Sequence, residues 1–189
     1  MAEQSTKVTI PKARLSYANV HVPVKAMDSE EEKYSCSVLW PKTDKKTTEA
    51  VQAAIKAAAA AALATKWEKV APKTYKDPPL RDGDEKFEED PEKYKAYKGM
   101  YYVAAKSKEK PTLLGKDKKE IASKTDIYSG CYCHVSVNFY GFKMKGNKGI
   151  AVGLNGLMKF SDGEALAGRG NVVADFDGYE ANTDEDQDF

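Results

Sequence analysis

The segment 131–142 alternates two kinds of side chain that could do different work. Its odd-numbered positions carry mostly apolar side chains, while its even-numbered positions carry aromatic and hydrogen-bonding groups. The second set comprises Tyr132, His134, Ser136, Asn138, Tyr140 and Phe142. In a strand the two sets face opposite ways, so the apolar set packs inward. Rings on the other face suit nucleic-acid bases, which stack on aromatic side chains whatever their identity. A second small core or a dimer contact would explain the same rings.

Lysine and tyrosine are interleaved in the segment 92–119, which holds nine lysines against three acids. Lysine neutralises phosphates without reading sequence, and tyrosine stacks on unpaired bases. The chain has three arginines, which argues against a sequence-specific reader of duplex DNA. We therefore predict a groove for single-stranded nucleic acid. Its phosphate contacts would come from Lys93, Lys95, Lys98, Lys106, Lys143, Lys145 and Lys148, and its stacking surfaces from Tyr94, Tyr101, Tyr102, Tyr132, Tyr140 and Phe142.

Two other clusters contain metal-ligating residue types but lack a suitable arrangement. Cys131, Cys133 and His134 cannot readily share an ion, because on a strand the thiols face one way and the imidazole the other. Asp82 and Asp84 could hold the divalent ion of a nuclease, but two carboxylates in one loop are more often turn chemistry. The sequence has no nucleophile elbow and no phosphate-binding glycine loop. We expect no enzymatic activity, no metal and no other cofactor, and keep a metal-dependent nuclease as a disfavoured alternative.

The charge of the chain is unevenly distributed. The net charge is +1, yet residues 175–189 carry seven acids and no base, which leaves a formal +8 on residues 1–174. We predict a nucleic-acid-binding domain over 1–174 and a disordered acidic tail over 175–189, which has few groups to bury. The tail can compete with a polyanion for the basic surface. Its end suits capture by a basic, apolar pocket on a partner, through Asp184, Glu185, Asp186, Asp188 and Phe189.

The elements that must position these groups can be read from the periodicity. We expect strands at Leu15–Val22, Tyr34–Trp40, Met100–Ala105, Tyr128–Lys145 and Ile150–Phe160, a turn at Gly146–Gly149, an Ala-rich helix at Thr47–Lys69 capped by Thr43 or Asp44, and a long connection over 71–99. This content indicates a mainly β protein with an OB-fold-like, five-stranded open barrel. The sequence has neither a membrane-spanning apolar run nor a signal peptide, so we expect a cytoplasmic protein whose three cysteines are free thiols.

Four blocks of the chain resemble a known family. They are YSCSVLWPKTD at 34–44, KGMYYVAAKSKEKP at 98–111, YSGCYCHVSVNFYGFKMKGNKGIAVGLNGLMKFSDGEALAGR at 128–169, and the acidic end that finishes in Phe189. In order and spacing these blocks are similar to the single-stranded DNA-binding proteins of tailed bacteriophages. The resemblance implies an OB-fold that coats single-stranded DNA in phage replication, recombination and repair, in the cytoplasm of the bacterial host. It also implies a tail that recruits a polymerase, helicase or primase-helicase.

The resemblance brings no catalytic residues and no base-stacking positions with it, so the expected contacts rest on the alternation and the charges. The favoured hypothesis is a sequence-tolerant single-stranded DNA-binding protein. The alternative is a non-enzymatic interaction or oligomer-scaffold protein that uses the aromatic face as a protein interface. The sequence leaves a homodimer open.

Overall fold

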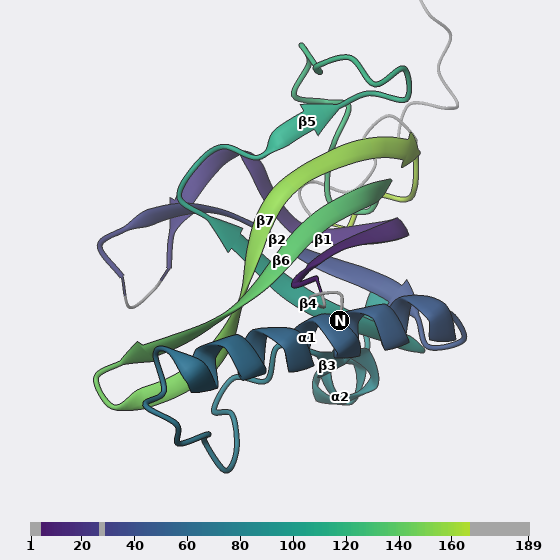
Figure 1. Ribbon diagram of the computed structural model, residues 1–189. Helices are drawn as coiled ribbons and strands as arrows, with labels where there is room; N and C mark the ends of the chain where they lie inside the picture. Colours follow the sequence, from purple (N-terminus) through teal and green to yellow (C-terminus); the bar gives the residue numbers. More distant parts are fainter. Residues whose placement is uncertain (1–4, 27–28, 167–189) are drawn as a thin grey trace, which may run out of the picture.

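Long strands dominate the computed structural model of the protein, which describes residues 5–26 and 29–166 (Figure 1). The elements in chain order are β1 (Lys7–Lys25), β2 (Glu32–Pro41), α1 (Lys45–Ala64), β3 (Arg81–Asp82), α2 (Gly83–Glu89), the 3-10 turn η1 (Lys95–Tyr97), β4 (Met100–Ser107), β5 (Thr112–Leu114), β6 (Tyr132–Met144) and β7 (Asn147–Ser161). The boundary predicted after residue 174 and the acidic tail lie outside the described residues.

Five of the strands form a barrel in the order β4-β2-β1-β6-β7. Neighbours in this order run antiparallel, and a parallel bridge between Lys106 of β4 and Gly153 of β7 closes the barrel. The short strands β3 and β5 extend it, β3 beside β4 and β5 beside β7. This is the arrangement of an OB-fold, a five-stranded and partly open barrel. The prediction of a mainly β, OB-fold-like protein is confirmed.

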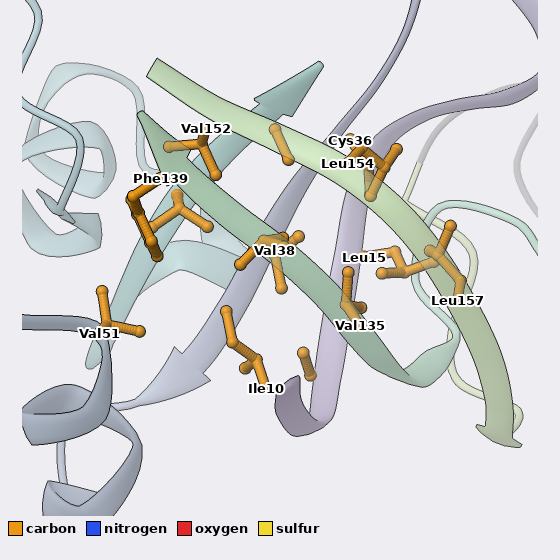
Figure 2. Close-up of a cluster of buried hydrophobic side chains, with 14 of the residues drawn as sticks. Ile10, Leu15, Cys36, Val38, Val51, Val135, Phe139, Val152, Leu154 and Leu157 are labelled. Atoms are coloured by element: carbon orange, nitrogen blue, oxygen red, sulfur yellow. The ribbon is translucent and has the colours of Figure 1, made fainter. Parts of the chain in front are cut away.

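The core of the barrel consists of side chains that alternate along the strands. Figure 2 shows Ile10, Val38, Val135, Phe139 and Leu154 converging from four strands. All five are less than 4% exposed. The predicted alternation of β6 is confirmed, since its odd-numbered positions through Gly141 are buried and its even-numbered positions are not. Each outward side chain from Tyr132 to Tyr140 therefore has a buried neighbour on each side, which fixes its direction.

Helix α1 lies along one end of the barrel and packs on the inward side of β6 (Figure 1). It begins at Asp44, whose carboxylate accepts a hydrogen bond from Thr47 N at 3.2 Å, as an N-cap residue does. It ends at Ala64, five residues earlier than predicted, because the backbone leaves helical geometry at Thr65, with φ −124° and ψ −84°, and Glu68 and Lys69 further on have positive φ angles of 54° and 64°. The turn that follows α1 inserts Trp67 beneath β6, where it is 1% exposed.

Three parts of the chain carry more structure than their local sequence predicts. Strand β1 begins at Lys7 rather than Leu15, because its first half pairs with β6. The expected connection over 71–99 contains β3, α2 and η1. The β6–β7 hairpin turns at Lys145 and Gly146 alone rather than over Gly146–Gly149, so β7 begins at Asn147, and both turn residues have the positive φ that a tight two-residue turn needs. Among the described residues, no helix is long and apolar enough to cross a membrane.

Candidate nucleic-acid interface

A groove of about 370 Å³ lies between β4, the β6–β7 hairpin and the segment 77–81. It brings together three predicted residues from two separate segments, Lys106 of β4 with Tyr140 and Phe142 of β6. The groove has two further cations that sequence reasoning missed, Lys33 and Arg81, against one acid, Asp77. Pro78, Pro79, Ala104, Ile150, Ala151 and Val152 complete its walls. We call this hollow the β4–β7 groove.

The rings of the β4–β7 groove are positioned by the hairpin itself. Tyr140 is 44% exposed, and Lys66 Nζ lies 5.7 Å from the centroid of its ring. Phe142 lies across its register partner Gly149, where an added Cβ would come within 2.6 Å of the Phe142 ring. A glycine at position 149 is therefore what lets the Phe142 ring lie flat against the hairpin.

A second hollow of about 410 Å³ adjoins the groove and shares Asp77, Pro78 and Arg81 with it. Its lining also contains Tyr101 and Tyr102, together with the acids Asp82, Glu85 and Glu89. These carboxylates make the hollow a poorer place for a phosphate than the β4–β7 groove, since like charges repel.

The two predicted tyrosines of β4 are less accessible than their expected role requires. Tyr102 is 5% exposed and packs edge-on against Tyr97, with ring centroids 5.0 Å apart. Together with Leu39 they form a small separate core. Tyr102 therefore offers no free stacking face, and that expectation needs correction. Tyr101 is partly buried beside Trp40, with centroids 6.4 Å apart, and Lys42 Nζ lies 5.2 Å from its ring.

The carboxylates of Asp82 and Asp84 are both engaged by Lys42. Lys42 Nζ lies 2.6 Å from Asp82 Oδ1 and 2.6 Å from Asp84 Oδ2. Asp82 also accepts a hydrogen bond from Asp84 N, as the N-cap of α2, and Asp84 accepts one from Gly99 N at 2.8 Å. The Lys42 hydrogen bond, followed by that of Gly99, lowers the pKa of Asp84 below 3.8. The two carboxylates link the residues after β2 and before β4 to the start of α2. Because Lys42 already neutralises both, they are not a pair awaiting a metal ion, and the nuclease alternative loses its support.

The lysines of the segment 93–98 lie around η1, away from the β4–β7 groove. Lys93 and Tyr17 line a smaller hollow of about 200 Å³ with Tyr97, and the last described residue, Leu166, lies at the same place. Lys93 Nζ lies 5.1 Å from the ring of Tyr94. Tyr17 is 46% exposed, and burial of its hydroxyl followed by its hydrogen bond with Tyr94 raises its pKa to about 12.

The other predicted lysines differ in how far they are already engaged. Lys148 Nζ donates to Trp67 O at 3.0 Å and to Val70 O at 2.8 Å, so it ties the hairpin to the turn after α1. Lys143 pairs with Glu68 at 3.2 Å. The remaining three predicted lysines, Lys95, Lys98 and Lys145, are exposed.

Tyr132 lies at the opposite end of β6 from Tyr140, eight residues away along the strand. Its ring lies 5.7 Å from the guanidinium carbon of Arg14, and it does not line the β4–β7 groove. The structure thus divides the predicted site among the β4–β7 groove, the surroundings of η1, the hairpin tip and the far end of β6.

The thiols predicted to be free are free and buried. Cys131 and Cys133 point into the core, with their sulfur atoms 3.7 Å apart, whereas His134 points outward and its Nδ1 accepts a hydrogen bond from Lys12 N at 3.2 Å. The prediction that the thiols and the imidazole face opposite ways is confirmed. Among the described residues, no group of three or more Cys, His, Asp or Glu side chains could hold a metal ion.

Solved structures with the same fold include phage single-stranded DNA-binding proteins. The protein of bacteriophage Enc34, solved in complex with single-stranded DNA, is 25% identical, with a TM-score of 0.65 over 88% of this chain and 96% of its own. The C-terminally truncated form of that protein gives a TM-score of 0.70 at 22% identity over 87% of this chain and 94% of its own. The gp2.5 protein of bacteriophage T7, at 16% identity and a TM-score of 0.57, covers 96% of this chain and 98% of its own, and shares the fold.

Sequence comparison extends the likeness over nearly the whole chain. Protein p50 of Acyrthosiphon pisum secondary endosymbiont phage 1 is 30% identical over 181 residues, which cover 90% of this chain and 92% of p50. The profile of the family described as Enterobacter phage Enc34, ssDNA-binding protein, matches residues 6–189. This family is one of DNA-binding proteins, in agreement with the prediction that the chain is not an enzyme. With its OB-fold barrel and a family match that leaves out only the first five residues, the chain belongs to the Enc34-type family of phage single-stranded DNA-binding proteins.

Proposed function

We propose that the β4–β7 groove is the principal contact of this protein with single-stranded DNA. Lys33, Arg81 and Lys106 neutralise phosphates, while Tyr140 and Phe142 stack on unpaired bases. The observation that carries the proposal is that three cations and two rings from four separate parts of the chain converge on one hollow with a single acid. An aromatic side chain can stack only on a base that is unpaired and accessible, so the groove favours a single strand over a duplex.

The remaining predicted residues extend this contact on both sides. Around η1 there are cations and one ring, from Lys93, Tyr94, Lys95 and Lys98. At the hairpin tip there are three more cations, from Lys143, Lys145 and Lys148. Lys143 and Lys148 would have to give up Glu68 or backbone carbonyls to reach a phosphate, so we assign them a smaller share of the binding energy. Lysine-dominated contacts read no sequence, and binding is therefore expected to be sequence-tolerant.

Stacking in the groove is tested with Tyr140→Ala, and Tyr140→Phe serves as its matched control because it keeps the ring. A lost stacking contact costs ~1–3 kcal/mol per base, or roughly five- to 150-fold in affinity for oligothymidine. The Tyr140→Phe variant should bind as the wild type does. Equal affinities of Tyr140→Ala and wild type, measured by filter binding at fixed salt, would remove Tyr140 from the site.

The electrostatic part of the groove is tested with Lys106→Ala, and Lys56→Ala on the exposed side of α1 is a control with the same change of charge. Each phosphate contact on a single strand contributes about 0.7 to the slope of log affinity against log salt. The slope should fall by about that amount for Lys106→Ala and stay unchanged for Lys56→Ala. Identical slopes for both variants would show that Lys106 acts only through the overall charge.

We further propose that the acidic tail competes with DNA and recruits replication proteins such as a polymerase, helicase or primase-helicase. The support is a formal +8 on residues 1–174 against seven acids in 175–189, and the position of Leu166 beside Lys93 and Tyr17, from which the chain continues toward the tail. Deletion of residues 175–189 should tighten DNA binding at low salt and abolish capture of such partners. Unchanged affinity of the deletion variant at low salt would rule out the competition, whatever happens to partner binding.

A further inference from the structure

Strands β1, β6 and β7 carry cations and rings on their outer side and no acidic residue of their own, and the nearest acids in sequence, Asp162 and Glu164, follow the end of β7. Neither Asp nor Glu occurs in any of these three strands. In the part of β1 that pairs with β6, Ile10 and Ala13 are buried, as is Leu15 next to it, so Lys12 and Arg14 point outward. We call the surface formed by Lys7, Lys12, Arg14, Tyr132, His134 and Phe160 the β1–β6–β7 face. A sheet surface with cations and no carboxylates attracts a polyanion.

Aromatic rings on this face lie next to its cations. Lys12 Nζ lies 5.1 Å from the centroid of Phe160, which is 41% exposed, and the guanidinium of Arg14 lies 5.7 Å from the ring of Tyr132. The ring of His134 meets Phe160 at 5.4 Å with an interplanar angle of 61°. The face thus offers both groups that a single strand needs, cations for phosphates and rings for bases, as in the β4–β7 groove.

A bulge in β1 brings Lys12 to this position. The register between β1 and β6 shifts between Ile10 and Ala13, and Lys12 adopts a φ of 49°, which is costly for a residue other than glycine. The strained residue donates its backbone N–H to His134 Nδ1 at 3.2 Å, which holds the bulge against β6. Bulges of this kind re-aim a side chain, and here the side chain is the cation beside Phe160.

The face continues into the β4–β7 groove along one strand. The outward positions of β6 run from Tyr132 through His134, Ser136 and Asn138 to Tyr140, which lines the groove. At the rise of a β-strand, Tyr132 and Tyr140 are about 26 Å apart. A strand of about 4 nucleotides seated in the groove is too short to reach Tyr132, whereas a longer strand that follows β6 can.

We propose that the β1–β6–β7 face is a second single-stranded DNA contact, which engages only strands long enough to leave the β4–β7 groove and follow β6. The proposal rests on the proposed function of the groove and adds to it a length-dependent site. The charge of the face fits the polyanion, and its contiguity with the groove gives the same strand a path. Phe160 and Tyr132 stack on bases there, and Lys7 and Lys12 contact phosphates.

The test compares two variants of the full-length chain on two lengths of oligothymidine. The face variant carries Lys12→Asn and Phe160→Ala, and asparagine is chosen because it tolerates a positive φ. The groove variant carries Lys106→Ala and Tyr140→Ala. Single OB-folds cover about 4–16 nucleotides, so probes of about 4 and about 30 nucleotides separate one site from two. Equal melting temperatures establish that each variant is folded, and Lys7→Gln against Lys56→Gln gives a milder pair that alters exposed charge alone.

The face variant should bind the short probe as the wild type does and lose at least about fivefold on the long probe, the loss expected for one stacked base. Lys7→Gln should lower the salt slope on the long probe only, and Lys56→Gln should leave it unchanged. A face variant that binds both lengths like the wild type, or loses equally on both, overturns the proposal. A wild-type affinity accompanied by altered self-association would instead identify the face as a protein interface and overturn it too.

The two proposals fail in different ways. A groove variant that keeps wild-type affinity for the short probe refutes the groove while leaving the face to be judged on the long probe. Photo-crosslinking with 5-iododeoxyuridine gives an independent readout, since the long probe should label the peptides that contain Tyr132 or Phe160 and the short probe should not.

Discussion

Replacement of Gly141 by alanine is the sharpest test of how α1 supports the groove. Gly141 lies between Tyr140 and Phe142 on β6, with its inward side against α1. A Cβ at this position would lie 2.2 Å from Ala62 Cβ and 3.5 Å from the Trp67 ring. Two methyl carbons cannot approach so closely, so the helix must move away from the strand.

The close approach of α1 to β6 maintains two hydrogen bonds, and the expected loss of stability can be estimated from the overpacking. Lys66 Nζ donates to Gly141 O at 3.0 Å, and Trp67 Nε1 donates to Phe142 O at 3.0 Å, so both hydrogen bonds lengthen when α1 moves. Overpacking of a core typically costs about 1–3 kcal/mol. At about 2–4 °C per kcal/mol for a protein of this size, Gly141→Ala should lower the melting temperature by about 2–12 °C.

A double-mutant cycle separates this clash from other effects of the substitution. Ala62→Gly removes the opposing methyl and by itself costs about 1 kcal/mol through helix propensity. With the clash gone, Gly141→Ala combined with Ala62→Gly should be no less stable than Gly141→Ala alone, and the coupling energy should reach about 1 kcal/mol or more. Chemical denaturation of the four proteins measures it. Additive losses would refute the steric reasoning, because they would mean that the two positions do not press on each other.

Three further predictions concern parts of the molecule outside the helix contact. Asp84→Asn should lower the melting temperature at neutral pH. The lowered pKa of Asp84 in the folded protein stabilises the fold at pH values above 3.8, and this contribution disappears as the pH falls through that lowered pKa. The melting curves of the variant and the wild type should therefore converge only in acid. Cys36 should resist a thiol reagent until the chain unfolds, since it is 2% exposed and burial raises its pKa, and rapid labelling of the native protein would contradict this. Lys148→Met should cost more in melting temperature than in DNA affinity, because Lys148 Nζ already binds two backbone carbonyls, and the reverse ranking would make it a phosphate contact.

The parts of the fold that the sequence predicted well are those whose pattern is repeated locally. The alternation of β6 and the hairpin that follows it depend on residues adjacent in sequence, and α1 is rich in alanine, which favours a helix locally. The first half of β1 carries no such pattern, because Pro11 and Lys12 interrupt it at a bulge. Its strand conformation comes from pairing with β6, more than a hundred residues later, which no local window contains.

Composition does not decide which lysines are available to bind phosphates. The sequence predicts the same role for Lys106 and Lys148, a contact with a phosphate. In the structure Lys106 is exposed in the β4–β7 groove, whereas Lys148 donates to the carbonyls of Trp67 and Val70 in the turn after α1. A backbone carbonyl accepts a hydrogen bond from a lysine ammonium group as a phosphate oxygen does, so lysine density alone overestimates the number of phosphate contacts.

Two of the tyrosines interleaved with the lysines stabilise the fold rather than face the groove. Tyr97 and Tyr102 form a small core with Leu39, with ring centroids 5.0 Å apart. Their burial has a physical reason, since a single turn such as η1 has little stability of its own and needs an apolar anchor to stay on the barrel. That anchor holds Lys95 and the neighbouring Lys93 and Tyr94 in place. Truncation of Tyr97 should therefore weaken DNA binding only by releasing η1, whereas truncation of Tyr140 removes a ring that itself faces the groove.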